Sequence, residues 1–213
     1  VKWKGPGVSS GLEDQRSYKY TYDKSDRLKT SVFQAHNGVS WNREVNTLNE
    51  TLNYDANGNI SSLQRNQNLR GLSGITLTSA PQTLDNLTYT YDGSNQNRLT
   101  KVEDSGLTAG FSNNVNTATE YTYNTDGALT KDDNKGISSI SYNLLGKPTQ
   151  IAYTNGKSVS YTYDATGNKL KMVMVDSTVS TTTDYVSGYV YLNGSLSFFG
   201  SPEGRVVKTG SLF

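Results

Sequence analysis

The feature that most constrains the fold is a short motif that recurs along the whole chain. A tyrosine is followed directly by Asp or Asn, and in most copies a glycine stands four residues after the tyrosine. The six copies are Tyr22-Asp23, Tyr54-Asp55 with Gly58, Tyr91-Asp92, Tyr123-Asn124 with Gly127, Tyr142-Asn143 with Gly146, and Tyr163-Asp164 with Gly167. A catalytic motif normally occurs once, whereas a motif that occurs this often is first of all a building unit.

The local chemistry of the motif predicts a β-hairpin. In YTY (121–123) the two tyrosines lie two residues apart, so on a strand they share one face. The Asp or Asn that follows favours a turn, and the glycine accepts a positive φ without steric cost. The motifs in YDKSDRL and YDGSNQNRL lack the glycine, which predicts longer turns or turns of another type. The last two intervals between motifs, 19 and 21 residues, fit two-strand units.

Other segments extend this pattern. Four Asn-Gly pairs indicate further hairpin turns. We predict strands at 75–80 and 182–199, a strand rather than a helix at 42–52, and loops at 64–74 and 105–118. No change in composition marks a domain boundary. The sequence therefore predicts an all-β fold, a curved antiparallel sheet of hairpins with little or no helix, as one continuous region over 1–213.

The composition indicates a folded but polar chain. Only 33% of the residues are hydrophobic, yet tyrosine is abundant and the net charge is +1, which argues against disorder. The absence of cysteine excludes disulfides and thiolate metal sites. No apolar run approaches the roughly 20 residues of a membrane-spanning helix. The sequence has no basic stripe of the kind that indicates nucleic-acid binding. No signal peptide is visible in the sequence.

Residues capable of catalysis are few. His36 is the only histidine and lies beside an Asn-Gly turn, which predicts an exposed turn residue. Asp132, Asp133 and Asn134 lack the spacing of a calcium loop, so we interpret them as a solvated turn. Glu13-Asp14 and Glu103-Asp104 are interpreted as surface pairs. We predict no catalytic, cofactor or metal site and no enzymatic activity.

The rows of tyrosines leave two interpretations open. The favoured one is that most rings form the packing layer of the sheet. The alternative is that exposed rings, together with nearby Asn and Asp, bind a glycan or a partner surface. The direction in which the rings point distinguishes the two.

The motif, approximately YD-x-x-G-x-[LI], resembles the YD repeat of the Rhs and teneurin families. YDANGNI and YNTDGAL fit it directly, and YDATGNKL fits with the apolar residue one position later. The stretch DNKGISSISYNLLGKPTQIAY before YTYDATGNKL, and the later YVYLNGSLSFFGSPEGRVV, look like the C-terminal part of the repeat region in Rhs proteins of Bacteroides-type bacteria.

This resemblance implies a fold and a role. YD-repeat arrays form a β-ribbon that spirals into a hollow shell, and in bacterial Rhs and toxin-complex proteins the shell encloses a toxic C-terminal domain. An autoprotease built from DPxG motifs often releases that domain, but no proline of this chain follows an aspartate. We therefore expect a fragment of a secreted or cell-surface protein, whose partner is the remainder of its own chain, including an enclosed toxin.

Overall fold

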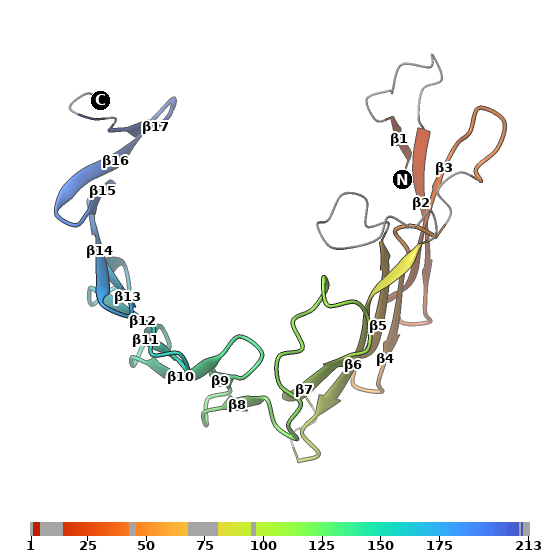
Figure 1. The fold of residues 1–213 in the computed structure, drawn as a ribbon, viewed down its shortest axis with the longest axis horizontal. Helices are drawn as coiled ribbons and strands as arrows, with labels where there is room; N and C mark the ends of the chain where they lie inside the picture. Colours follow the sequence, from red (N-terminus) through yellow and green to blue (C-terminus); the bar gives the residue numbers. More distant parts are fainter. Residues whose placement is uncertain are drawn as a thin grey trace. The chain divides into compact units, whose positions relative to one another are not determined.

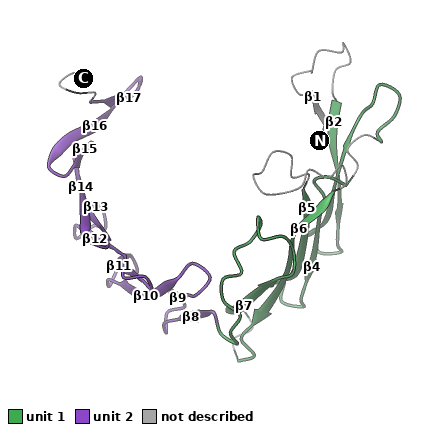
Figure 2. Ribbon diagram, in the orientation of Figure 1, with its two compact units in different colours: residues 1–119 green, residues 120–213 purple. Residues whose placement is uncertain are grey.

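The computed structural model describes residues 2–4, 15–42, 46–67, 81–94, 97–208 and 210. Every regular element in this part of the chain is a β-strand, and every strand pairing is antiparallel, so the predicted all-β fold is confirmed (Figure 1). The structure divides into two compact units, residues 1–119 and residues 120–213 (Figure 2). Each unit contains one sheet, in which the strands follow one another in chain order.

The first unit holds a seven-stranded sheet. Its strands are β1 (Lys2–Lys4), β2 (Gln15–Tyr22), β3 (Leu28–Ala35), β4 (Glu50–Tyr54), β5 (Ile60–Gln67), β6 (Gln82–Tyr91) and β7 (Leu99–Asp104).

The second unit holds a ten-stranded sheet. Its strands are β8 (Tyr121–Tyr123), β9 (Leu129–Asp132), β10 (Ile137–Tyr142), β11 (Pro148–Tyr153), β12 (Ser158–Tyr163), β13 (Lys169–Asp176), β14 (Val179–Val186), β15 (Tyr189–Leu192), β16 (Ser195–Ser201) and β17 (Gly204–Val207).

The described strands form two sheets, where the sequence analysis predicted one continuous sheet. The reason lies in the segment after β7, which forms no strand and folds back over β6 of its own sheet. There the N–H of Leu107 donates to the carbonyl of Leu84 at 3.0 Å, and the N–H of Phe111 donates to the Asp85 carboxylate at 2.7 Å. That residues 1–213 are one repeat region of a longer chain stays a prediction.

The first unit has a small apolar core on one face of its sheet. Alternation along each strand places side chains of neighbouring strands in register, with Leu52 opposite Leu63 and Leu63 opposite Leu87. The buried apolar residues of this unit are Phe33, Ala35, Leu52, Leu84, Leu87 and Val102. They come from β3, β4, β6 and β7, and the half-buried Leu63 of β5 lies between Leu52 and Leu87, so the core connects consecutive hairpins.

The second unit is organised differently. Among its described residues, Ile137 is the only apolar side chain that is buried, while Glu120, Asp132 and Asn134 are buried polar groups. Most apolar side chains of this sheet are half-buried or exposed. Its stability therefore depends on strand pairing and on contacts between adjacent strands more than on a central core.

The remaining segment predictions have mixed outcomes. The loop predicted at 64–74 is wrong for residues 64–67, which belong to β5: the pairing of β5 with β6 fixes this stretch as a strand despite its polar side chains. Residues 68–80, which include the rest of that predicted loop and the predicted strand at 75–80, lie outside the described residues. In 42–52 the strand begins only at Glu50, after a turn at 46–48. The strands in 182–199 and the loop at 105–118 are confirmed.

Candidate functional site

The repeated motif forms a closed turn with the same backbone hydrogen bonds in most copies. At Asp55 the N–H of the aspartate donates to the carbonyl of Asn59 at 2.9 Å, and the N–H of Gly58 donates back to the carbonyl of Asp55 at 3.2 Å. The same pair of bonds recurs at Asn124, Asn143 and Asp164. The glycines of these four turns have φ values between 69° and 91°, the left-handed region that glycine was predicted to supply.

The side chain that heads each turn also closes it. One oxygen of Asp55 accepts the N–H of Asn59 at 2.8 Å, and the side-chain oxygens of Asn124 and Asn143 do the same four residues on, at 2.8 and 2.9 Å. Asp or Asn serves equally well for this bond, because either residue presents the accepting oxygen. This explains why the motif tolerates both residues.

Three of the turns add a contact that only a carboxylate can make. The second oxygen of Asp23 accepts from the Arg27 Nε at 2.7 Å, and those of Asp55 and Asp164 accept from an asparagine amide four residues on, each at 2.8 Å. These bonds favour the ionised form.

The pKa values follow from these contacts. The Asn59 side-chain amide, followed by the turn's backbone N–H groups, lowers the pKa of Asp55, and the Arg27 backbone N–H lowers that of Asp23. The Asn168 amide and the Thr166 hydroxyl lower the pKa of Asp164 to about 2. All three carboxylates are therefore fixed as anions and as turn elements.

The two turns without the glycine behave differently from each other. At Asp23 the expectation of another turn type is wrong: the turn has the same bonds to Arg27, and Asp26 takes the glycine's place with φ 59°. A single aspartate tolerates this conformation because its short polar side chain costs less there than a bulky one. At Asp92 the longer turn is confirmed, since its N–H reaches the carbonyl of Arg98, six residues on.

Within each unit, the motif tyrosines of the second and third motif turns bond to the strand that follows the preceding turn. The Tyr54 hydroxyl donates to the carbonyl of Leu28 at 2.8 Å, and Leu28 is the first strand residue after the turn at Asp23. Within the described units the same bond recurs between Tyr91 and Ile60 at 2.8 Å, Tyr142 and Leu129 at 2.6 Å, and Tyr163 and Pro148 at 2.9 Å. We call this contact the tyrosine staple.

The staple explains why tyrosine, rather than phenylalanine, occupies the motif. A ring alone would pack between neighbouring hairpins, but only the hydroxyl reaches a carbonyl of the preceding repeat. Two strands of an up-and-down sheet separate successive motif turns. Within each unit these turns therefore lie at the same end of the strands. The predicted motif residues therefore form a structural row along each sheet and do not converge on a single site.

The other candidate residues from the sequence are His36 and the two acidic pairs. His36 lies in its turn as predicted but is half-buried: its Nδ1 accepts the N–H of Gly38 at 3.1 Å and its ring meets Trp41 edge-on. Glu103 pairs with Lys101 at 2.7 Å. Asp104 is half-buried and accepts backbone N–H groups. Glu13 and Asp14 lie outside the described residues.

The interpretation of residues 132–134 as a solvated turn is wrong. Asp132 and Asn134 are buried, because β9 lies between β8 and β10 and Asp132 faces Tyr121 on one side and Ile137 on the other. The Asn134 amide donates to Glu120 at 2.8 Å, and Lys135 pairs with Asp132 at 3.3 Å. In the part of the chain that the structure describes, no three His, Cys, Asp or Glu residues gather as metal ligands.

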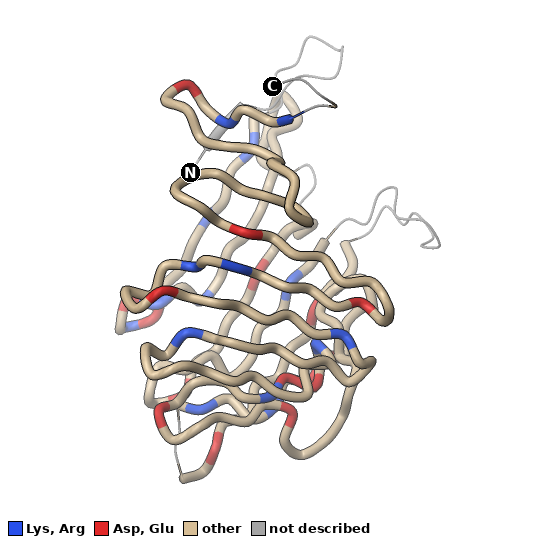
Figure 3. The backbone as a smooth tube through the Cα atoms, turned by 90° about the vertical axis from the view of Figure 1, so that its left-hand side faces the viewer, with Lys and Arg blue, Asp and Glu red and all other residues tan. Residues whose placement is uncertain are grey.

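The exposure of the tyrosine rings fully supports neither the packing-layer interpretation nor the binding interpretation. Most described rings are half-buried, and only Tyr20, Tyr22 and Tyr189 are exposed, at 38%, 58% and 44%. Charged residues of both signs are interspersed along the strands and turns (Figure 3). No helix within the described ranges is long and apolar enough to cross a membrane.

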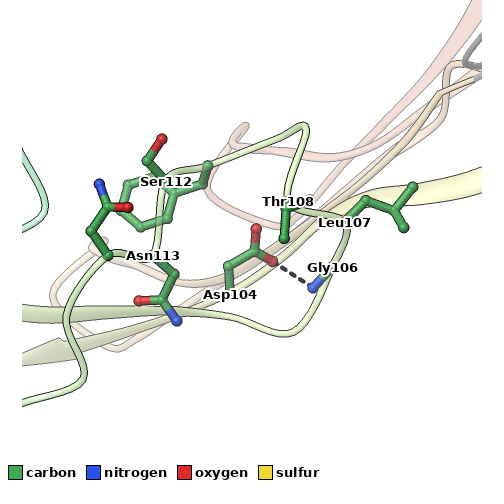
Figure 4. A pocket seen from close by; sticks show the side chains of 8 residues that line it. Asp104, Gly106, Leu107, Thr108, Ser112 and Asn113 are labelled. Carbon is green, nitrogen blue, oxygen red and sulfur yellow. Dashed lines mark hydrogen bonds between the residues drawn. The ribbon is translucent and has the colours of Figure 1, made fainter. Parts of the chain in front are cut away.

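Sequence reasoning missed concave sites in both units. A cavity of about 160 Å³ in the first unit is lined by Asp104, Gly106, Leu107, Thr108, Phe111, Ser112, Asn113 and Asn114 (Figure 4). A wider one of about 800 Å³ lies in the second unit between two motif turns, lined by Asn124, Asp126, Ala128, Tyr142, Asn143, Leu144 and Gly146. The first had no sequence signal, because its residues belong to a stretch that reads only as a polar loop.

Comparison with known proteins gives one family match. The family model described as RHS Repeat matches residues 142–179, which contain two of the six motifs and run from the end of β10 to the start of β14. No curated protein matches the chain.

The solved structures that resemble this chain share little sequence identity with it. A crystal structure of TcdB2-TccC3 without the hypervariable C-terminal region is 14% identical, with a TM-score of 0.41, over 93% of this chain and 12% of that one. A Tc holotoxin pore of Photorhabdus luminescens with a mutation in TccC3 is 12% identical, with a TM-score of 0.36, over 94% of this chain and 12% of that one. The present chain spans about an eighth of these chains, and its match to the RHS Repeat model covers residues 142–179.

Proposed function

We propose that this chain is a non-enzymatic structural segment of a secreted or cell-surface Rhs-type protein, and that its hairpins form part of a β-shell enclosing a C-terminal toxin. The observation that supports this most is the tyrosine staple. It bonds the second and third motif hairpins of each unit to the hairpin before them, so that stability accumulates between neighbours, as expected of a repeat array that extends over a long wall.

The second unit has the chemistry of a wall between two environments. Along β10 to β12, Ile140, Ile151 and Val159 lie opposite one another on one face of the sheet. The other face holds serines, Gln150 and one small apolar residue, Ala152. A single sheet with one apolar and one polar face suits a boundary between water and a sequestered polypeptide. The RHS repeat in residues 142–179 lies within this part.

The proposal includes the finer features of the assignment. The whole of 1–213 is one YD-repeat region of a longer, Bacteroides-type chain, near the C-terminal end of its repeats. Its partner is the remainder of that chain. The motif residues act structurally, and no cofactor takes part.

The test uses the parent protein purified from its own host. Intact mass and a denaturing gel show whether a C-terminal piece is cleaved yet co-elutes with the repeat region. Co-elution that survives high salt and ends only on unfolding would support an enclosed cargo. A parent without any retained piece would exclude the toxin shell and leave the second candidate, a surface module that recognises a glycan or partner through exposed Tyr, Asn and Asp.

A further inference from the structure

The only histidine of the chain lies against the backbone of an Asn-Gly pair. His36 follows β3, and its own N–H donates to the carbonyl of Gln15 at 2.9 Å, which ties it to β2. Its half-buried ring meets Trp41 edge-on, with the ring centroids 5.1 Å apart. In this orientation Nδ1 of His36 accepts the N–H of Gly38 at 3.1 Å. A backbone N–H can only donate, so Nδ1 presents a lone pair in this contact.

The side chain of Asn37 is held at the same turn. Its Oδ1 accepts the N–H of Val39 at 2.9 Å and the N–H of Ser40 at 2.8 Å, and its Nδ2 donates to Oδ1 of Asn42 at 2.6 Å. The two N–H donors polarise the side-chain carbonyl and stabilise negative charge that develops on its oxygen, as the donors of an oxyanion hole do. Asn37 and Gly38 are both exposed, so water reaches the pair.

These contacts place a base, a nucleophile and an activated carbonyl together. The backbone nitrogen of the residue after an asparagine can attack the Cγ of that asparagine and close a succinimide ring. A glycine at that position leaves the approach open, because it has no side chain. The attack also requires that the N–H lose its proton, and at Gly38 the acceptor of that N–H is an imidazole nitrogen.

We propose that Asn37 is a site of self-catalysed deamidation, in which His36 acts as the general base. Nδ1 of His36 takes the proton of the Gly38 N–H while the bond from that nitrogen to Cγ of Asn37 forms. The imidazole then returns the proton to Nδ2 of Asn37, the bond from Cγ to Nδ2 breaks, and ammonia leaves. Water opens the succinimide at either carbonyl and leaves aspartate or isoaspartate at position 37.

Two other Asn-Gly pairs show what the histidine adds. At Asn57-Gly58 and Asn155-Gly156 the asparagine and the glycine are exposed, as they are at Asn37. There the glycine N–H donates to a backbone carbonyl, that of Asp55 at 3.2 Å and that of Tyr153 at 3.1 Å. A backbone carbonyl does not take up a proton at neutral pH, so these pairs have the same dipeptide without the base.

The modification changes the connection between β3 and β4. It adds a negative charge beside His36, and isoaspartate also lengthens the backbone inside the turn that the N–H of Asn37 closes with the carbonyl of Ser40 at 3.0 Å. The proposal does not depend on the shell, because none of these residues belongs to the repeated motif.

The test follows the 213-residue protein during incubation at neutral pH, with mass spectrometry of its peptides to quantify aspartate and isoaspartate at each Asn-Gly pair. A positioned general base contributes roughly 10²–10⁴-fold in enzymes, so we expect Asn37 to convert at least about tenfold faster than Asn57 and Asn155. In denaturing urea the difference should shrink, because the contact between His36 and Gly38 is lost.

Variants assign the base. His36→Gln and His36→Asn each supply an amide oxygen that can accept an N–H, but neither takes up the proton. Both should slow conversion at Asn37 by about tenfold or more. Asn155 serves as the matched control within the same molecule and should convert at an unchanged rate. Amide NMR signals of Val39 and Ser40 show whether the turn persists, and the comparison of sites in the wild type needs no variant.

Three results would overturn the proposal. The first is conversion at Asn37 that is no faster than at Asn57 and Asn155 in the folded wild type. The second is a rate at Asn37 that both substitutions of His36 leave unchanged. The third is a preference for Asn37 that persists undiminished in urea, which would assign it to the local sequence instead.

Discussion

At the scale of the residue, the motif tyrosine performs two tasks at once. Its ring packs half-buried between hairpins, and its hydroxyl spans to the carbonyl of the preceding repeat. A buried or half-buried hydroxyl that is bonded contributes modestly, but removing it leaves the carbonyl without its donor. The contribution of the staple can therefore be separated from that of the ring by removing one oxygen atom.

Replacing Tyr142 by Phe should lower the free energy of unfolding by about 0.5–1.5 kcal/mol, because the 2.6 Å bond to the Leu129 carbonyl is lost while the ring remains. Urea unfolding followed by circular dichroism measures the change. Tyr153→Phe is the matched control, since Tyr153 is also half-buried in this sheet and its hydroxyl makes no bond to a described residue. Equal effects of the two substitutions would contradict the staple.

The carboxylates that head the turns make the fold sensitive to acid. The pKa of Asp164 in the folded protein is about 2, below its ordinary value of 3.8. The folded state thus binds this proton less readily than the unfolded state. The stabilisation is therefore complete above about pH 4 and is lost as the pH falls toward 2.

Asp164→Asn should remove this pH dependence, because asparagine keeps the oxygen that closes the turn, as Asn124 and Asn143 do. The free energies of unfolding of the wild type and the variant should converge as the pH is lowered from about 5 to 2. Urea titrations at several pH values measure the difference. A difference that stays constant with pH would show that the ionised carboxylate does not act through its turn bonds.

At the scale of the element, the hairpin turn is fixed by backbone geometry more than by the identity of one residue. Asp26 adopts the left-handed conformation that glycine has in four other motif turns. Its side chain is exposed and has no hydrogen bond to a described residue. The turn therefore forms despite this residue.

Asp26→Gly should raise the free energy of unfolding by up to about 1 kcal/mol, because glycine adopts positive φ without the steric cost of a Cβ. The reciprocal substitution, Gly146→Asp, should lower it by a similar amount: Gly146 has φ 69°, and a Cβ there meets no atom within 4 Å, so only backbone strain changes. Thermal unfolding of both variants tests this. Stabilisation by Gly146→Asp would refute the argument.

At the scale of the whole molecule, the two units differ in what stabilises them. The first has a buried apolar core, whereas among the described residues of the second only Ile137 is buried and apolar. Core substitutions should therefore be costly in the first unit and mild in the second.

Leu87→Ala should cost about 2–5 kcal/mol, since Leu87 is buried. Leu192→Ala should cost about 0.5 kcal/mol or less, since Leu192 is 46% exposed. The chain's two tryptophans, Trp3 and Trp41, belong to the first unit, so their fluorescence follows that unit while circular dichroism follows both. A large loss from Leu192→Ala would show that its face is covered in solution.

The sequence by itself determined the all-β class, the antiparallel hairpins and the positions of the motif turns, but not every strand, since residues 64–67 belong to β5 where a loop was predicted. These depend on local chemistry: alternation, an Asx side chain and a glycine at positive φ act within five or six residues. Tertiary structure alone decided the tyrosine staples, which join residues 13 to 31 positions apart. It also decided the burial of Asp132 between two neighbouring strands and the folding of residues 105–111 onto β6. Each of these depends on which strands become neighbours, and that is set by pairing across the sheet, which no short stretch of sequence specifies.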